Sequence, residues 1–116
     1  MARKPTEAPL SAVMGPGSRY EGDLSFEGRV RVDGLFVGRI YTEELLEVGP
    51  DGVVEGEADV ARAWVAGTLK GKIRVRELLV LEPTARVEGV LDVGRLEVRA
   101  GARIDARVLA TGEERP

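Results

Sequence analysis

The feature that most constrains the fold is a seven-residue frame that recurs along the chain every 15 to 18 residues. In most copies it reads apolar, charged, Gly, charged, small or apolar, charged, apolar, and residues 54–60 (VEGEADV) show it best. The copies begin at residues 20, 36, 54, 69, 87 and 104, and the last has Ala106 in place of Gly. Pairs of apolar residues two apart repeat with nearly the same spacing, starting at 30, 46, 63, 79 and 96. Two interleaved series with one period indicate a repeat architecture.

The alternation inside each frame predicts a β-strand with one buried and one solvated face. A unit of about 17 residues leaves no room for helices between strands, but it suits coils that stack strand on strand at ~4.8 Å. We therefore predict an all-β, single-domain β-solenoid of about six coils over residues 17–110. Residues 1–16 and 111–116 are expected to be flexible tails. The Gly of each frame is expected to let the backbone bend into a crowded interior.

Stacking the frames also aligns their outward charges. Residues 55, 57 and 59 are acidic, residues 70, 72 and 74 are basic, and residues 88 and 92 are acidic again. Unlike charges would therefore be lateral neighbours, which favours this register over a shifted one. Corners such as residues 49–52 (GPDG) carry strong turn residues, whereas Ala66-Gly67 lacks that insertion and explains the 15-residue step.

Composition excludes several kinds of chemistry. The 116 residues include neither Cys nor His, so disulfides, thiolate or imidazole metal sites and His-activated nucleophiles are ruled out. No phosphate-binding Gly-Lys-Ser/Thr loop occurs, and a net charge of −3 gives no reason to expect nucleic acid. We expect no catalytic residues, cofactor or metal, and neither nucleotide nor nucleic acid as a partner.

A solenoid has two open ends, and these are the candidate interaction sites. Terminal coils expose unpaired backbone groups with apolar side chains behind them, and such edges are either capped or used for pairing. One interpretation is that the tails fold back and cover them. The other is polymerisation from end to end, with contacts at Tyr20, Leu24 and Phe26 at the N-terminal end and Ile104, Val108 and Leu109 at the C-terminal end.

Two other surfaces are weaker candidates. Leu10, Val13 and Met14 follow two cations and could form a peripheral membrane contact, the alternative being a merely disordered tail. Trp64 and Val80 fall on outward positions and could form a lateral contact between filaments; otherwise they are tolerated surface residues.

Several of these segments resemble the bactofilins: residues 15–24 (GPGSRYEGDL), 32–34 (VDG), 54–56 (VEG) and 85–89 (ARVEG), within a similarity over roughly residues 15–108. The resemblance implies a right-handed parallel β-helix and a bacterial cytoskeletal protein of the cytoplasm. It also implies spontaneous polymerisation without nucleotide into non-polar filaments that join head-to-head and tail-to-tail. Many members contact the inner face of the cell membrane through a short N-terminal apolar segment.

Two other functions remain open at this point. One is a monomeric solenoid that binds a ligand or polysaccharide, for which Trp64 and Tyr41 are the aromatic candidates. The other is a β-helical enzyme, which needs a set of carboxylates in a cleft.

Overall fold

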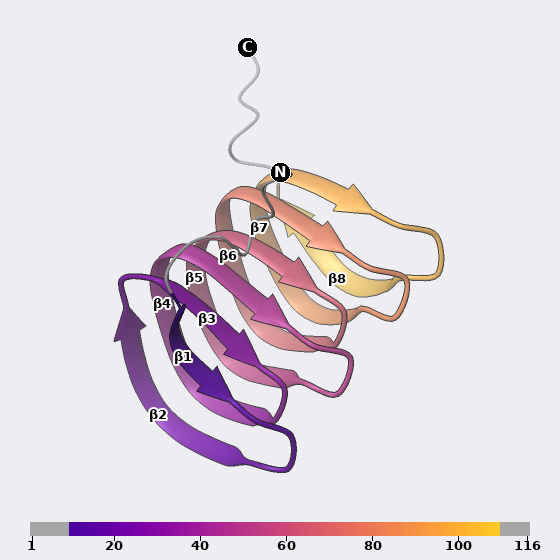
Figure 1. Cartoon of the computed structure of the whole chain (residues 1–116). Coiled ribbons are helices and arrows are strands. Elements are labelled where there is room, and N and C mark those ends of the chain that lie inside the picture. Colours follow the sequence, from indigo (N-terminus) through magenta and orange to yellow (C-terminus); the bar gives the residue numbers. More distant parts are fainter. Residues whose placement is uncertain (1–9, 110–116) are drawn as a thin grey trace, which may run out of the picture.

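The computed structural model describes residues 10–109, and these contain only strands and turns (Figure 1). All pairings between strands are parallel, in the order β1-β3-β4-β5-β6-β7-β8, with β2 pairing β4. The strands are β1 (Leu10–Met14), β2 (Arg19–Phe26), β3 (Arg29–Val32), β4 (Leu35–Val48), β5 (Val53–Val65), β6 (Thr68–Leu81), β7 (Arg86–Val98) and β8 (Arg103–Leu109).

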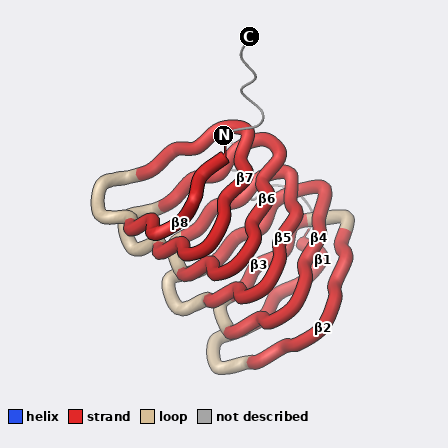
Figure 2. The backbone as a smooth tube through the Cα atoms, turned by 180° about the vertical axis from the view of Figure 1, so that it is seen from behind, coloured by secondary structure: helices blue, strands red, loops and turns tan. Residues whose placement is uncertain are grey.

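The strands wind into a β-solenoid of about six coils with two walls (Figure 2). The long strands β4 to β7 pass through both walls. The pairing of each shows a register irregularity near the middle of the strand, where it bends from one wall to the other. We call the first wall the stack of β2, the first halves of β4 to β7, and β8. The second wall is the stack of β1, β3 and the second halves of β4 to β7. The all-β solenoid expected from the repeats is confirmed.

The register reproduces both series of the sequence. In the first wall Tyr20 pairs with Phe36, and the column continues through Val54, Leu69, Val87 and Ile104. In the second wall Val30, Leu46, Ala63, Leu79 and Leu96 form the matching column. The alternation therefore predicts the pairing residue by residue.

The solenoid begins earlier than residue 17. Leu10–Met14 forms β1 and pairs with β3, with Met14 opposite Val32 and only 6 % exposed. Assigning residues 10–14 to a flexible tail was therefore wrong. Ala12 and Met14 are one more apolar pair two apart, 18 residues before Val30 and Val32, and they stack in the same column. Residues 1–9 and 110–116 lie outside the described part of the chain.

The interior between the walls is aliphatic, with Phe36 as its one fully buried aromatic among the described residues. Burying each Leu, Val or Ile contributes roughly 1.5–3 kcal/mol, so the stacked columns dominate stability. Thr42 is fully buried where the next three coils have Val, and its hydroxyl donates to the Gly28 carbonyl at 2.6 Å. That hydroxyl also accepts from the Glu44 N–H at 3.2 Å, so it is satisfied.

The repeated glycines are needed for a different reason from the one expected. Gly38, Gly56, Gly71 and Gly89 have φ between +113° and +136°, and an added Cβ would overlap the carbonyl oxygen of the glycine one coil earlier. Gly56 and Gly89 are solvent-exposed. The column therefore allows backbone to approach backbone at a bend in the wall, and relief of crowding in the interior was the wrong explanation.

The corners that lead from the second wall to the first alternate in length over the first five, and the last two are both four residues long. Four-residue turns closed by backbone hydrogen bonds follow β1, β4, β6 and β7, for example from the Gly52 N–H to the Gly49 carbonyl at 2.9 Å. Asp33-Gly34 and Ala66-Gly67 are two-residue corners between them. A Cβ on Gly67 would overlap the carbonyls of Gly49 and Gly52, so the short corner lies tightly against the longer turn before it.

Candidate polymerisation interfaces

The N-terminal end consists of β1 and β2, each of which has a strand neighbour on one side only. β1 pairs with β3 and β2 pairs with β4, so within residues 10–109 their other edges have no strand partner. Strand edges of this kind carry unpaired N–H and C=O groups that can pair with a further strand. The C-terminal end is equivalent: β8 and residues 95–98 of β7 are paired only with the preceding coil.

An apolar hollow of about 310 Å³ opens at the N-terminal end. It brings together the three residues predicted there, because all lie on the inward side of β2. Leu24 and Phe26 are half-buried against the core, whereas Tyr20 is 46 % exposed and stacks on Phe36 of the next coil with ring centroids 6.2 Å apart. The hollow is lined by Val13, Met14, Gly15, Ser18, Tyr20, Leu24 and Phe26.

The C-terminal end is aliphatic. Ile104 packs against the core and Val108 is 42 % exposed on the same side of β8, as expected for interior residues of a last coil. Sequence reasoning missed Val98, which is 48 % exposed, and the half-buried Leu96 beside it. The sequence did contain the information needed to predict them. Leu96 and Val98 are the last of the apolar pairs two residues apart, so no later pair stacks on them.

Leu109 faces the opposite way from Ile104 and Val108. It pairs with Asp92, whose column also contains Arg74, Asp59 and Tyr41, so its side chain lies on the outer side of the first wall. The one-residue step from Val108 to Leu109 reverses the direction of the side chain. Leu109 is therefore an exposed, outward-facing residue of the last coil, and its part in the end contact stays a prediction.

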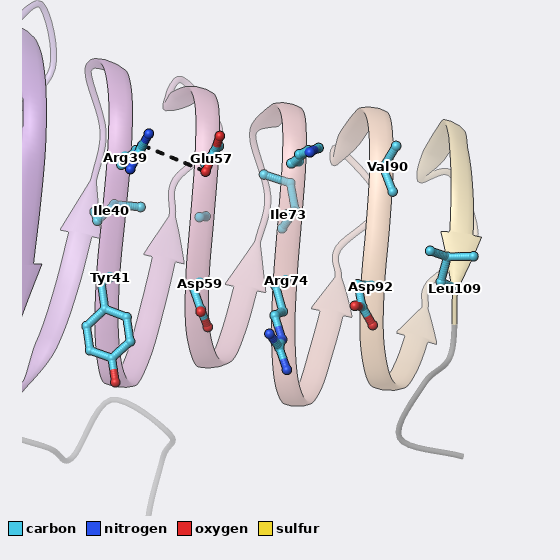
Figure 3. A pocket seen from close by; sticks show the side chains of 12 residues that line it. Arg39, Ile40, Tyr41, Glu57, Asp59, Ile73, Arg74, Val90, Asp92 and Leu109 are labelled. Carbon is cyan, nitrogen blue, oxygen red and sulfur yellow. Dashed lines mark ion pairs between the residues drawn. The ribbon is translucent and has the colours of Figure 1, made fainter. Parts of the chain in front are cut away.

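An open groove crosses the outer side of the first wall (Figure 3). Two rows of side chains border it, with Leu109 at one end and Tyr41 near the other. Glu57 lies 3.8 Å from the Arg39 guanidinium, and Asp59 lies 3.3 Å from that of Arg76. The predicted register holds, since Glu55 lies beside Lys70 and Asp59 beside Arg74. The ion pairs of Glu57 and Asp59, however, are made with Arg39 and Arg76 rather than with the cations directly beside them.

The charged side chains that line the groove are of both signs. Its carboxylates alternate with cations: Arg74 separates Asp59 from Asp92 in one row. Within residues 10–109 no group of three metal-binding side chains occurs. Alternating charges on an open surface stabilise the stacking of coils by a modest amount.

The residues predicted to contact the membrane differ in their exposure to solvent. Met14 faces the interior and is buried, so it is not available to lipid. Val13 is 57 % exposed on the outer side of the second wall, and the side chain of Leu10 lies outside the described part. Within residues 10–109 no helix is long and apolar enough to cross a bilayer.

The predicted lateral contact is also only partly exposed. Val80 is 2 % exposed and therefore cannot be a free surface contact. Trp64 is half-buried, and the Arg99 guanidinium lies over its ring at 5.9 Å. At the N-terminal part of the same wall, Arg31 donates two hydrogen bonds of 2.9 and 3.0 Å to Asp33, and this pairing raises the pKa of Arg31.

Comparison with known protein families identifies the family of this chain. The family model described as "Bactofilin: Polymer-forming cytoskeletal" matches residues 12–109. The chain is a bactofilin. No curated protein and no solved structure matched it. The resemblance seen in the glycine-centred frames is thereby confirmed, and membership in a polymer-forming cytoskeletal family identifies the chain as a filament-forming scaffold.

Proposed function

We propose that this bactofilin assembles without nucleotide into non-polar filaments by joining like ends, and that it acts as a scaffold rather than as an enzyme. The observation that carries the proposal is that both terminal coils have strand edges with no partner in the described chain, backed by apolar side chains. Extending the sheet from one molecule to the next pairs these edges and buries that apolar surface at once. The free energy of assembly then comes from strand pairing and apolar burial alone, so no nucleotide hydrolysis is required.

The two ends differ in chemistry, which favours like-to-like contact. The N-terminal end presents an aromatic ring beside an apolar hollow, so two copies related by a two-fold axis can place each Tyr20 near the hollow of the other. The C-terminal end presents branched aliphatic side chains, chiefly Val98, Ile104 and Val108. Two alternating two-fold contacts give a filament whose ends are equivalent.

Arginine substitutions at each end test this arrangement. Leu24→Arg and Ile104→Arg each place a charge into one apolar end, and each is expected to give discrete dimers joined through the intact end. Combining them is expected to give monomers. The matched controls are Ser25→Arg and Asp105→Arg, which change the next, outward-facing residue of the same strands and are expected to leave filaments intact. Negative-stain microscopy and sedimentation velocity without nucleotide provide the readouts.

The same variants separate like-end from head-to-tail assembly. If heads joined tails, either substitution alone would give monomers, and mixing the two single variants would give dimers through the remaining wild-type ends. Long filaments from Leu24→Arg or Ile104→Arg would show that the altered end is not an interface.

As part of the same proposal, the filaments lie in the cytoplasm on the inner face of the cell membrane, with Leu10 and Val13 as the lipid contact. The exposure of Val13 beside the N-terminal end supports this placement. Co-sedimentation with anionic vesicles is expected for the full chain and to be lost in Leu10→Glu/Val13→Glu. Equal pelleting of both proteins would refute the lipid contact while leaving the polymer intact.

A further inference from the structure

The outward side chains that follow the column of glycines form two rows across the first wall (Figure 3). β2, β4, β5, β6, β7 and β8 each contribute one residue to each row, because the register keeps equivalent positions side by side. Every side chain in the two rows is exposed or half-buried, so together they make an open outer surface. We call them the outer rows: the first runs from Asp23 to Arg107, and the second from Ser25 to Leu109.

Charge in the outer rows is ordered by strand. At β5 both rows are acidic, with Glu57 and Asp59, and at β6 both are basic, with Lys72 and Arg74. The boundary between β5 and β6 is also the midpoint of the six strands, with three strands on either side. Opposite charges on the two sides of its centre make this surface suited to an isologous contact with a second copy.

The central cations of the outer rows are not used by ion pairs of the described chain. Glu57 and Asp59 form their ion pairs with arginines other than Arg74. Within residues 10–109, Lys72 and Arg74 are exposed and have no carboxylate oxygen within 4.0 Å. The pair between Glu57 and Arg39 is long, at 3.8 Å, and both of its side chains are more than half exposed, so exchanging it for another partner costs little. The charges at the centre of this surface are therefore available to another molecule.

One two-fold arrangement sets opposite charges against each other. An axis along the strand direction, between β5 and β6, places the outer rows of two copies face to face with their coils in opposite order. Each row then meets itself, with β5 facing β6, β4 facing β7 and β2 facing β8. No two like charges meet, because every other facing pair includes an uncharged residue. The opposite charges that face each other are Glu57 with Lys72, Asp59 with Arg74, and Asp23 with Arg107.

Other arrangements of the same surfaces bring like charges together. Moving the axis by one coil sets either Glu57 or Lys72 against its own symmetry copy. Running the two copies in the same direction instead sets the two acidic residues of β5 against each other, and likewise the two basic residues of β6. Like charges in opposition are unfavourable, so the charge pattern selects one register and one relative direction.

The size of the outer rows decides when this contact forms. Six strands span five steps of ~4.8 Å, about 24 Å, and the two rows lie about 7 Å apart. Such a strip is well below the ~800 Å² per partner of a stable interface, so separate molecules stay apart. A filament repeats the strip at regular intervals, and after the first contact each further one forms at high effective concentration.

We propose that the outer rows are a lateral contact through which two filaments pair, with facing molecules antiparallel and β5 of each opposite β6 of the other. The occupant of this open surface is a second copy of the chain. The inference rests on the proposed function, since only filaments offer enough contacts. Pairing is weakened by salt, because the charges that make it are exposed.

Charge reversal tests the pairing and leaves the ends of the solenoid unchanged. Lys72→Glu/Arg74→Glu makes both central strands acidic and is expected to give single filaments of normal length. Low-speed centrifugation, which pellets bundles but not single filaments, is expected to collect several-fold less of this variant than of the wild type. Adding Glu57→Lys/Asp59→Lys exchanges the signs of the two strands and is expected to restore paired filaments in negative-stain images.

The four-fold variant separates contact between molecules from stacking within one. It sets a lysine beside Arg39 and a glutamate beside Asp92 in the same chain, so it does not restore the ladder of charges between coils. Its recovery therefore reports on the facing molecule. The matched control is Lys70→Glu/Arg86→Glu, which changes the net charge equally on the other side of the column of glycines and is expected to leave the pairs intact.

Cross-linking tests the register. The chain has no Cys, and Arg39→Cys/Val90→Cys places two thiols three coils apart, too far for a disulfide within one molecule. Across the proposed axis these two positions face each other. Oxidation of the filaments is therefore expected to give covalent dimers from the double variant and none from either single variant.

The outcomes distinguish this inference from the proposed function. Single filaments from the wild type, pairs that survive Lys72→Glu/Arg74→Glu, or pairs lost in the control would each overturn the inference and leave end-to-end assembly standing. Covalent dimers from a single cysteine variant would overturn the antiparallel register. Absence of filaments from every variant would overturn the proposed function and this inference with it.

Discussion

The column of glycines allows a test in which two substitutions differ mainly in one physical factor. Gly71 has φ +119° and an added Cβ would overlap the Gly56 carbonyl oxygen, well inside 3.0 Å. Gly22 has a similar φ of +138°, but nothing lies within 4 Å of its added Cβ, because no coil precedes it. Gly71→Ala therefore adds backbone strain and a clash with the neighbouring coil, whereas Gly22→Ala adds the strain alone.

The expected magnitudes follow from these two contributions. Holding Ala at such a φ costs about 1–3 kcal/mol. The clash in Gly71→Ala must be relieved by moving two coils apart, which weakens about two ladder hydrogen bonds worth ~1 kcal/mol each. We expect Gly71→Ala to lower the free energy of unfolding by about 3–5 kcal/mol and Gly22→Ala by about 1–3 kcal/mol.

Urea unfolding followed by far-UV circular dichroism measures both values. Polymerisation stabilises the folded state by mass action, so the comparison is made in the Leu24→Arg/Ile104→Arg background at one protein concentration. Equal losses for the two alanines, or a larger loss for Gly22→Ala, would refute the reasoning that close backbone approach between coils is what requires glycine.

Three further predictions concern side chains. Glu47→Ala removes a 2.7 Å ion pair with Arg29 that is mostly buried, and it is expected to cost about 2–3 kcal/mol of unfolding free energy. Glu57→Ala removes an exposed pair at 3.8 Å and is expected to cost under about 1 kcal/mol, so equal urea midpoints would contradict this reasoning. Thr42→Val leaves the Gly28 carbonyl and the Glu44 N–H without their partner, so a loss of about 1–3 kcal/mol is expected despite the Val found at this position in other coils, and an unchanged thermal midpoint would exclude that role. Val98→Arg is expected to give dimers like those of Ile104→Arg, because both side chains lie on the C-terminal end; filaments of normal length in sedimentation would remove residues 95–98 from the interface.

The repeats predict most of this fold because stacking makes each coil the template for the next. Once Val54 and Leu69 are placed in the same position of their frames, the pairing of the other residues of those two frames follows. The parity of Leu109 could also be read from its frame, where it follows the inward Val108. The first coil was harder, since Ala12 and Met14 form an apolar pair without a glycine-centred frame before them.

Burial on the outer side of the walls could not be predicted from alternation. The period-2 pattern separates inward from outward positions, but it treats Val80 and Lys72 alike as outward. Whether an outward side chain meets water depends on what lies over the wall, which is a matter of tertiary contact. The glycine column is a similar case, because its cause is the backbone of another coil.

The alternation of long and short corners gives one edge of the solenoid a toothed outline. Successive protruding turns in the first five corners lie two coils apart, or about 10 Å, with the short Asp33-Gly34 and Ala66-Gly67 corners as gaps. Along these first five corners, two molecules that meet edge to edge interlock at positions two coils apart, because a shift of one coil from an interlocked position sets turn against turn. The repeat distance along this edge is therefore twice the spacing between neighbouring strands.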